Sequence, residues 1–397
     1  MKINLKRIRK GTVFILILGI VSLFADFTYE GARSIIPQFF TSALGGSVFL
    51  LGIVLGLSEF AGYAFRLVSG RLADSTRRYW TMMFIGYAIN LFAVPLLALS
   101  GNYLVAAVLI FMERIGKGTR APPKDYIISM AASKGKTGRA FAINEALDQT
   151  GAILGPIVVS LALFFRGGYR DAFGLLAVPA LLAMAFLFVA YGYYGRNKLQ
   201  RKRQENSRPM TFRSFLIYSV AVAISAAGLY QVSFILYGAQ YMISTYLVPL
   251  IFLVAMAGEG AFGTIFGLMY DKAGRRLVYI GLLLPLLIPL LLLGGTFFLF
   301  IAALIFGAAI GVQDTVMRAV IGSMIHEKKR GSAYGIFNAF YGFGLMISGV
   351  VIGYLYYSIT DIMVYVAIAQ ATAFLMLYAS FRMSDMESNA AVAVSAS

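Results

Sequence analysis

The sequence has few of the residues on which much protein chemistry depends. It contains no cysteine, a single tryptophan and a single histidine, His326. The missing cysteines exclude disulfides and thiol catalysis, and one histidine excludes most histidine-based metal sites. No Gly-x-x-x-x-Gly-Lys-Ser/Thr phosphate loop occurs, which argues against an ATPase. We therefore expect no cofactor, no resident metal ion and no enzymatic activity.

Charged residues are also scarce, and the apolar residues that replace them indicate a membrane protein. Charged residues make up 13% of the chain, whereas soluble domains average about 25%. Hydrophobic residues make up 60%, whereas soluble domains average about 45–50%. Mean hydropathy is +0.80. The net charge of +17 would suit nucleic acid, but Lys and Arg cluster in short segments between apolar runs, as membrane topology requires. The predicted surroundings are a lipid bilayer, and no nucleic-acid partner is expected.

Apolar runs of the length needed to cross a bilayer, about 20 residues, recur along the whole chain. The twelve predicted spans are 11–37, 48–70, 79–100, 103–128, 137–165, 171–195, 212–237, 246–269, 276–294, 297–325, 331–357 and 361–381. An alternative interpretation of Met1–Ala25 is a cleaved signal peptide, but its removal would leave an odd number of spans.

The loops alternate between basic and nearly uncharged, which predicts their orientation. Lys and Arg gather in segments 2–10, 71–78, 134–139, 196–213, 272–276 and 328–330. The opposite loops have none apart from Arg166 and Arg170. The positive-inside rule therefore places both termini and the linker 196–211 in the cytoplasm, with the protein in the cell membrane. The linker is interpreted as a topology anchor and flexible tether, with binding to anionic lipid as the alternative.

A ten-residue pattern occurs twice and divides the chain into two similar halves. It begins at Gly70, between the second and third predicted spans, and again at Gly267, between the eighth and ninth. We therefore predict an all-α membrane protein with twelve transmembrane helices in two six-helix bundles related by pseudo-two-fold symmetry. The predicted parts are an N-terminal bundle (1–195), a cytoplasmic linker (196–211), a C-terminal bundle (212–382) and a disordered cytoplasmic tail (383–397).

Charged residues inside the predicted spans are the candidate functional residues, because they are costly in a bilayer and usually face protein or a water-filled cavity. Spans 3, 6, 9 and 12 have none in their interiors, which is typical of lipid-facing helices. The candidates for the proton-coupling and solute cavity are Asp26, Glu30, Arg33, Glu59, Glu113, Arg114, Glu145, Asp148, Gln149, Glu259, Asp314 and Arg318.

Counting 1.5 Å per residue places Glu59, Glu113, Arg114 and Asp148 about 15 Å deep, near the midplane of the bilayer. Three sets have the spacing of helix-neighbour ion pairs and could be purely structural: Glu30–Arg33, Glu113–Lys117 and Asp314–Arg318. Asp26 and Asp148 have no cation at that spacing. A carboxyl group in a low-dielectric environment can exchange protons near neutral pH, so these two are the preferred proton carriers.

The repeated pattern resembles the cytoplasmic signature of the major facilitator superfamily, Gly-x-Leu-Ala-Asp-Arg-x-Gly-Arg-Arg/Lys. The second copy matches at Gly267, Asp271, Lys272, Gly274, Arg275 and Arg276, and the first at Gly70, Leu72, Ala73, Asp74 and Arg78. Ser75 stands where the family prefers a basic residue and Arg77 where it prefers glycine, which leaves the turn of the first copy open. The resemblance covers essentially the full length and implies that these motifs are cytoplasmic gates.

Two more segments carry the resemblance. Arg114-Ile-Gly-Lys-Gly118 is similar to an Arg-x-x-x-Gly motif of span 4. Gly151-Ala-Ile-Leu-Gly155-Pro156 is similar to the Gly-x-x-x-Gly-Pro motif of the superfamily's antiporters, although Val159-Ser160 replaces its closing Gly-Gly. Gly-x-x-x-Gly is also a general device for close helix packing. Segments 26–33 and 144–149 resemble a poorly characterised prokaryotic branch of the superfamily, which names no substrate.

The predicted function is secondary transport of a small organic solute by alternating access, as a monomer, with proton-coupled export by antiport preferred. The alternatives are proton- or sodium-coupled uptake by symport and, less favoured, a membrane-embedded enzyme, a channel or a lipid scramblase. The charge of the solute stays undecided, because buried acidic groups favour a cation whereas Arg114 and Lys117 favour an anion. Aromatic and Met residues in the spans suit an amphiphilic molecule but equally suit ordinary helix packing.

Overall fold

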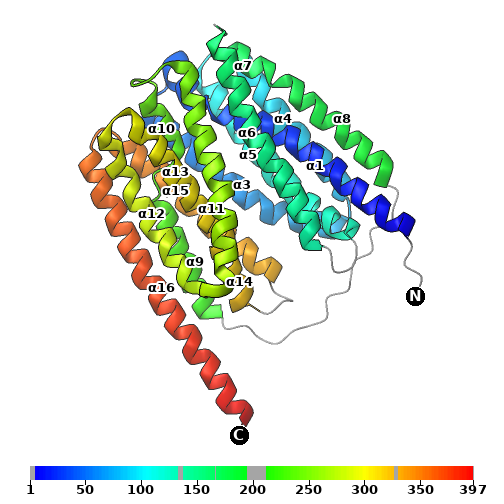
Figure 1. Cartoon of the computed structure of the whole chain (residues 1–397), viewed down its shortest axis with the longest axis vertical. Helices are drawn as coiled ribbons and strands as arrows, with labels where there is room; N and C mark the ends of the chain where they lie inside the picture. Colours follow the sequence, from blue (N-terminus) through cyan, green and yellow to red (C-terminus); the bar gives the residue numbers. More distant parts are fainter. Residues whose placement is uncertain (1–4, 133–136, 166, 195–211, 326–329, 397) are drawn as a thin grey trace. The chain divides into compact units, whose positions relative to one another are not determined.

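The computed structural model describes residues 5–132, 137–165, 167–194, 212–325 and 330–396, and the part of the chain it describes is helical without strands (Figure 1). The predicted linker 196–211, Arg166 and His326 lie outside the described residues. The all-α membrane fold predicted from the sequence is confirmed.

The helices follow the predicted spans closely. Those of the first half are α1 (Leu5–Arg33), α2 (Ile36–Gln38), η1 (Phe39–Ala43), α3 (Val48–Thr76), α4 (Tyr79–Leu96), η2 (Leu97–Leu99), α5 (Tyr103–Ala131), α6 (Thr137–Phe164), α7 (Tyr169–Leu175) and α8 (Ala177–Tyr194). Those of the second half are α9 (Phe212–Ala227), α10 (Val232–Ala239), η3 (Thr245–Leu247), α11 (Val248–Ala273), η4 (Gly274–Leu277), α12 (Val278–Leu291), η5 (Leu292–Gly294), α13 (Thr296–Val312), η6 (Gln313–Met317), α14 (Arg318–Met324), α15 (Arg330–Leu355) and α16 (Ile359–Ala396).

Among the described residues, eleven helical segments are long and apolar enough to cross a bilayer, so the chain is a multi-pass membrane protein. Of the twelve predicted spans, the fourth is not among the eleven. Its helix, α5, has 29 residues and is long enough to cross, but it carries charges from Glu113 to Asp125. The charges at Glu113, Arg114, Arg120 and Lys124 are buried in protein.

The C-terminal tail differs from the prediction. Residues 383–397 were predicted to be disordered, whereas α16 continues to Ala396. The reason is local: residues 383–396 contain neither glycine nor proline and are rich in alanine, which has the highest helix propensity.

The helices group into two compact units, each described by itself. The first comprises Met1–Ser47, Ala64–Arg201 and Leu236–Met256, and the second comprises Val48–Tyr63, Lys202–Ile235 and Ala257–Ser397. Each unit thus combines segments from both halves of the sequence. The bundle boundaries predicted at 195 and 212 stay a proposal.

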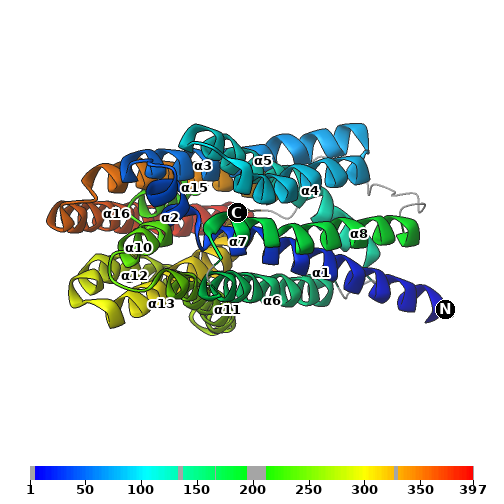
Figure 2. The same cartoon turned by 90° about the horizontal axis from the view of Figure 1, so that it is seen from above.

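In the first unit, α1 lies between α6 and α8 (Figure 2). Glycines allow α1 and α6 to approach closely. A Cβ added at Gly151 would lie 2.1 Å from the Leu23 carbonyl oxygen, and one at Gly155 would lie 2.4 Å from that of Phe27. This is the packing that small residues permit between membrane helices. It fixes the helix face that carries Asp148 against the face that carries Ser22 and Asp26.

In the second unit, two Gly-x-x-x-Gly segments meet, one from α3 and one from α15. A Cβ added at Gly52 would lie 2.1 Å from the Gly349 carbonyl oxygen, and one at Gly349 would lie 2.4 Å from that of Gly52. Gly56 and Gly353, one turn further along each helix, lie against the same crossing. The backbones therefore touch directly, with no side chain between them.

Candidate functional site

The charges of α5 follow one face of the helix. Glu113, Lys117, Arg120 and Lys124 are spaced by four, three and four residues, which places them in a stripe on one side. Glu113, Arg120 and Lys124 are buried, as is the neighbouring Arg114. Partners from α1, α4 and α6 meet this stripe. The resulting set of contacts in the first unit is called the polar network below.

At one end of the polar network, Glu113 is held by groups from two helices. The Asn90 side chain of α4 donates a hydrogen bond to Glu113 Oε1 at 2.7 Å, and Arg114 Nε lies 3.4 Å from Oε2. Asn90 also accepts a hydrogen bond from Arg120 Nε at 3.2 Å. Both groups of the Asn90 amide are therefore satisfied, which is the usual condition for burying an amide completely.

Arg120 connects this end to α1. Its Nη2 lies 3.9 Å from Asp26 Oδ1, and its guanidinium lies over the ring of Tyr87 at 4.4 Å. The side chain of Arg120 is only 3% exposed and that of Asp26 is 14% exposed. A buried guanidinium thus contacts a carboxylate, an amide and an aromatic face from two neighbouring helices.

Further along α5, Lys124 joins α1 to α6. Its Nζ donates to Ser22 Oγ at 3.0 Å and lies 3.4 Å from Asp148 Oδ2. The Asn144 side chain also donates to Asp148 Oδ2, at 2.8 Å, and Ser22 in turn donates to the Asn144 side-chain oxygen Oδ1 at 3.1 Å. The other carboxylate oxygen, Asp148 Oδ1, is buried and has no hydrogen-bond partner among the residues that the structure describes.

The most exposed contacts of the network surround Glu30. Arg33 Nη1 lies 3.0 Å from Glu30 Oε2, and Lys117 Nζ lies 3.5 Å from Oε1. The Lys117 ammonium also lies over the ring of Tyr29 at 4.1 Å, and the Arg33 guanidinium lies over Phe252 of α11 at 5.7 Å. One carboxylate therefore holds two cations, each steadied by an aromatic face.

Two of the ion pairs expected from helix spacing are confirmed and one is wrong. Glu30–Arg33 forms, and Asp314–Arg318 forms at 2.8 Å in the second unit. The expected Glu113–Lys117 pair is replaced, because Glu113 is held by Asn90 and Arg114, whereas Lys117 reaches across to Glu30.

The candidate site predicted from the sequence did not include several residues of the polar network. Asp26 and Asp148 lack cations on their own helices, as noted from spacing, but α5 supplies Arg120 to the first and Lys124 to the second. The spacing of basic residues along α5 was the available signal. The sequence-based site also did not include the residues that complete these contacts, namely Ser22, Tyr87, Asn90, Lys117 and Asn144.

The remaining candidates lie on α6 of the first unit and on segments of the second unit. Gln149 donates to Glu145 Oε1 at 3.2 Å on the exposed side of α6. Asp314 is the second residue of the π-helical segment η6. It follows Gln313, whose side-chain oxygen accepts a hydrogen bond from the Tyr341 hydroxyl. Glu59 and Glu259 are half-buried in the second unit.

The two copies of the gate motif share one backbone feature. Arg77 has φ 57° and Gly274, at the matching position, has φ 62°. The first copy therefore keeps the left-handed turn although arginine replaces the family's glycine. Asp74 accepts a hydrogen bond from the Tyr79 hydroxyl at 3.0 Å, and Arg275 pairs with Asp385 of α16 at 2.5 Å. The side chain of Asp271 is not described.

The strain at Arg77 predicts a stabilising substitution. A non-glycine residue in the left-handed region destabilises the folded state by about 1–2 kcal/mol. Glycine removes this strain, but it lowers the stability by about 0.5–1 kcal/mol because the unfolded chain gains conformational entropy. We expect Arg77→Gly to raise the free energy of unfolding by about 0.5–1 kcal/mol. Thermal unfolding of the purified protein measures this, with Arg78→Gly, at φ −95°, as the control that should give no gain. Equal or lower stability of Arg77→Gly would show that the turn is not strained.

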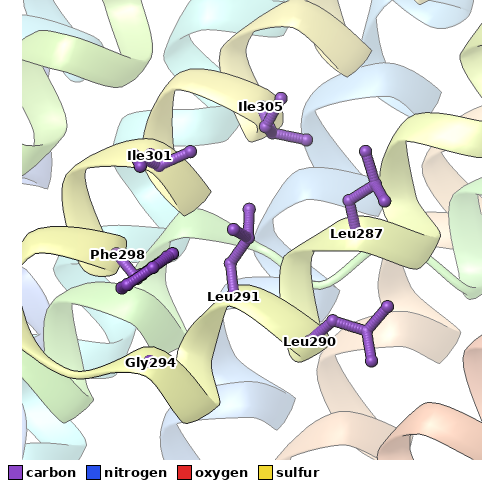
Figure 3. A pocket seen from close by; sticks show the side chains of 7 residues that line it. All are labelled: Leu287, Leu290, Leu291, Gly294, Phe298, Ile301 and Ile305. Atoms are coloured by element: carbon purple, nitrogen blue, oxygen red, sulfur yellow. The ribbon is translucent and has the colours of Figure 1, made fainter.

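A separate cavity lies between α12 and α13 of the second unit. Its volume is about 330 Å³, and it is lined by Leu287, Leu290, Leu291, Gly294, Phe298, Ile301 and Ile305 (Figure 3). These side chains carry no polar atom, so none of them offers a hydrogen bond to a polar solute. The polar network is therefore the better candidate for solute and ion binding.

Comparison with known proteins agrees with this architecture. The model of the Major Facilitator Superfamily matches residues 18–256 and 216–393. An uncharacterized protein of Mycobacterium tuberculosis is 33% identical over 383 residues, which cover 92% of each chain. An uncharacterized MFS-type transporter of Methanocaldococcus jannaschii is 26% identical over 355 residues, 86% of this chain and 87% of the relative.

Solved structures show the same fold at low sequence identity. A variant of the nucleoside transporter NupG has a TM-score of 0.73 at 15% identity, covering 93% of this chain and 99% of that one. A POT family transporter in complex with a thioalcohol-conjugated peptide has a TM-score of 0.76 at 13% identity, covering 93% and 96%.

Proposed function

Because the chain belongs to the Major Facilitator Superfamily and is a membrane transporter of that type, we propose that it moves a small organic solute by alternating access coupled to protons. In this proposal both termini are cytoplasmic and the protein works as a monomer. Export by antiport is the first candidate for the direction, with proton- or sodium-coupled uptake as the second.

The carboxyl group of Asp148 carries the proposal. Its Oδ2 contacts Lys124 and Asn144, whereas its buried Oδ1 has no hydrogen-bond partner in the described part of the chain. An ionised oxygen without a hydrogen bond is costly to bury. Binding a proton at Asp148 removes that charge and weakens the ion pair with Lys124, which joins α6 to α5. The protonated and ionised forms therefore favour different arrangements of these helices, which is what a coupled transporter needs.

Asp26 is the second proton-binding candidate. It lies 3.9 Å from Arg120, too far for a strong hydrogen bond, so its ionised form is supported by charge more than by direct bonding. Like Asp148, it joins α5 to a neighbouring helix. Neutralising either carboxylate would loosen α5 from that helix, so both are consistent with a device that alternates between two states.

Each direction of coupling has one observation in its favour. Antiport is supported by the resemblance of Gly151, Gly155 and Pro156 to the antiporter motif. Their close packing against α1 explains the glycines equally well. Symport is supported by Glu30, because a proton on that carboxylate would weaken its ion pair with Lys117 and make the ammonium group available to a bound solute. The direction of pH change during solute movement distinguishes the two.

The test uses proteoliposomes that contain a pH-sensitive dye and are challenged with a panel of small organic solutes. We expect at least one solute to change the internal pH. Asp148→Asn should abolish this change while exchange of labelled solute at a fixed pH continues, because exchange needs no net proton movement. Asp361→Asn, an exposed carboxylate, is the matched control and should behave as the native protein. Full pH-driven accumulation by both Asp26→Asn and Asp148→Asn would contradict proton coupling.

A further inference from the structure

A second group of buried polar side chains lies in the second unit, around the start of η6. Gln313, the first residue of η6, is 2% exposed, and its Oε1 accepts a hydrogen bond from the Tyr341 hydroxyl of α15. The nitrogen of the same amide, Nε2, is buried without a hydrogen-bond partner among the described residues. Asn338 of α15 has a buried side-chain oxygen, Oδ1, that also lacks a partner there. Proteins seldom bury such groups unless water or a ligand completes their hydrogen bonds.

The two atoms are complementary, yet they do not satisfy each other. Gln313 Nε2 is an amide donor and Asn338 Oδ1 is an amide acceptor. Tyr341 connects the two residues, because it donates to Gln313 and follows Asn338 by three positions on the same face of α15. A hydrogen bond between the two atoms would satisfy both, but the described structure forms none. The pair therefore suits a third group that accepts from Gln313 and donates to Asn338.

Aromatic rings lie beside this pair. The ring of Tyr341 is within 5° of parallel to that of Phe337, with centroids 6.4 Å apart. Phe337 is in turn within 17° of parallel to Tyr218 of α9, at 6.1 Å. Tyr63 of α3 meets Tyr341 edge-on at 5.3 Å. A planar molecule of low polarity would therefore find aromatic surfaces next to the two amide atoms.

The helix is irregular at the same place. η6 is π-helical, and short π-helical segments within longer helices are frequent at functional sites. Two tyrosine hydroxyls bind the backbone at its end. Tyr218 donates to the Met317 carbonyl oxygen at 2.8 Å. Tyr334 donates to the Arg318 carbonyl oxygen at 3.2 Å. Side chains of α9 and α15 thus hold the segment that positions Gln313.

The chemistry of the two atoms selects a class of ligand. A neutral amide, urea or lactam has a carbonyl oxygen for Gln313 and an N–H for Asn338. A carboxylate has no donor for the Asn338 oxygen, and an ammonium group has no acceptor for the Gln313 N–H. Either mismatch leaves a buried polar atom unpaired. A site built from hydrogen-bonding groups rejects ligands that lack the matching group strongly for this reason.

We infer that Gln313 and Asn338 bind an amide-type group of the transported solute. Gln313 Nε2 donates to its carbonyl oxygen, and Asn338 Oδ1 accepts from its N–H. The Tyr341 hydroxyl occupies the oxygen of Gln313, so the nitrogen of that amide is left for the solute. This inference rests on the proposed transport function and specifies one neutral group of the solute. The proton-binding role stays with the carboxylates of the polar network.

The test measures binding to the purified full-length protein by thermal shift. The four probes share a phenyl ring, which suits the aromatic surroundings, and are benzamide, N,N-dimethylbenzamide, benzoate and benzylamine. We expect benzamide to stabilise the protein and each of the other three to bind at least tenfold more weakly. N,N-dimethylbenzamide keeps the carbonyl oxygen but has no N–H, so it tests the contact with Asn338. Benzoate has no donor and benzylamine, as an ammonium, has no acceptor.

Two variants assign the contacts. Asn338→Leu should remove the preference for benzamide over N,N-dimethylbenzamide, because the N–H no longer meets an acceptor. Gln313→Met should weaken benzamide binding at least tenfold, because the carbonyl oxygen loses its donor. A purely structural role would weaken all probes alike and would leave the preference unchanged. Thr372→Val, on the exposed side of α16, is the control and should bind as the native protein does, because its hydroxyl donates to the Ile368 carbonyl oxygen of its own helix.

The selectivity of the native protein decides the inference even if a variant does not fold. Equal stabilisation by benzamide and N,N-dimethylbenzamide would overturn it, as would no stabilisation by benzamide or a stronger effect of benzoate or benzylamine. So would native selectivity in Asn338→Leu. Proton-coupled solute movement that is unchanged in both variants would leave the proposed function intact and refute this site. Benzamide binding that depends on both residues, without movement of any solute in proteoliposomes, would support the site and contradict transport.

Discussion

Replacing Arg120 with methionine is expected to destabilise the folded protein by about 3–5 kcal/mol and to abolish transport. The physical reason is the burial of its partners. Arg120 is 3% exposed and contacts Asp26, the amide oxygen of Asn90 and the ring of Tyr87. Methionine fills a similar volume but leaves a buried carboxylate without its cation and an amide oxygen without its donor.

Thermal unfolding and solute exchange of the purified variant measure both effects. The double variant Asp26→Asn/Arg120→Met should recover part of the lost stability, because it leaves no uncompensated charge. Arg139→Met, at an exposed position, should change stability by no more than about 0.5 kcal/mol. If Arg120→Met unfolds at the native temperature, the contacts of Arg120 contribute little and the network is looser than its distances indicate.

The second large effect is expected at the crossing of α3 and α15. Any side chain at Gly349 must enter the space of the Gly52 carbonyl oxygen, which lies 2.4 Å from the position of the added Cβ. Gly349→Val should therefore force the helices apart, at a cost of about 1–3 kcal/mol, and reduce transport more than tenfold. Gly349→Ala should have an intermediate effect, because its Cβ meets the same oxygen.

The consequence for transport follows from the predicted bundles. In the proposed bundle division, Gly52 belongs to the N-terminal bundle and Gly349 to the C-terminal bundle. The two bundles would therefore move past each other at this contact, where no side chain lies between the backbones. Gly192→Val in α8 is the control, since nothing lies within 4 Å of an added Cβ there. If Gly349→Val exchanges solute at the rate of the native protein, then transport does not require close contact between α3 and α15.

The sequence was sufficient to predict the positions of the spans and the ion pairs within one helix. Apolar runs located the helices, and i+3 or i+4 spacing identified Glu30–Arg33 and Asp314–Arg318. The same rule failed for Lys117, because spacing shows which residues can meet but not which partner from another helix is nearer. Glu30 is far from Lys117 in sequence, and only the packing of α1 against α5 brings them within 3.5 Å.

The principal members of the site were therefore visible individually but not as a network. Asp26 and Asp148 were selected because no cation stood near them in sequence, yet each has one across a helix interface. Predicting such partners requires the rotation of every helix about its axis, which depends on backbone contacts such as Gly151 against Leu23. Composition carries no information on these rotations. For the C-terminal tail (383–396), by contrast, composition was informative, because its alanine content favours a helix although the sequence analysis predicted disorder.

The charge carried by α5 also constrains how the protein is made. Each Arg, Lys or Asp at the centre of a helix opposes insertion into the membrane by about 2.5–3.5 kcal/mol, and α5 has Arg114, Lys117 and Arg120 near its middle. Without partners from other helices, such a segment would not insert stably into the membrane. The partners Asn90 and Asp26 precede it on α4 and α1, but Asp148, the partner of Lys124, follows on α6. Lys124 thus gains its carboxylate partner only when α6 follows, so we expect a chain that stops after Ala131 to integrate its last helix less efficiently than a chain that includes α6.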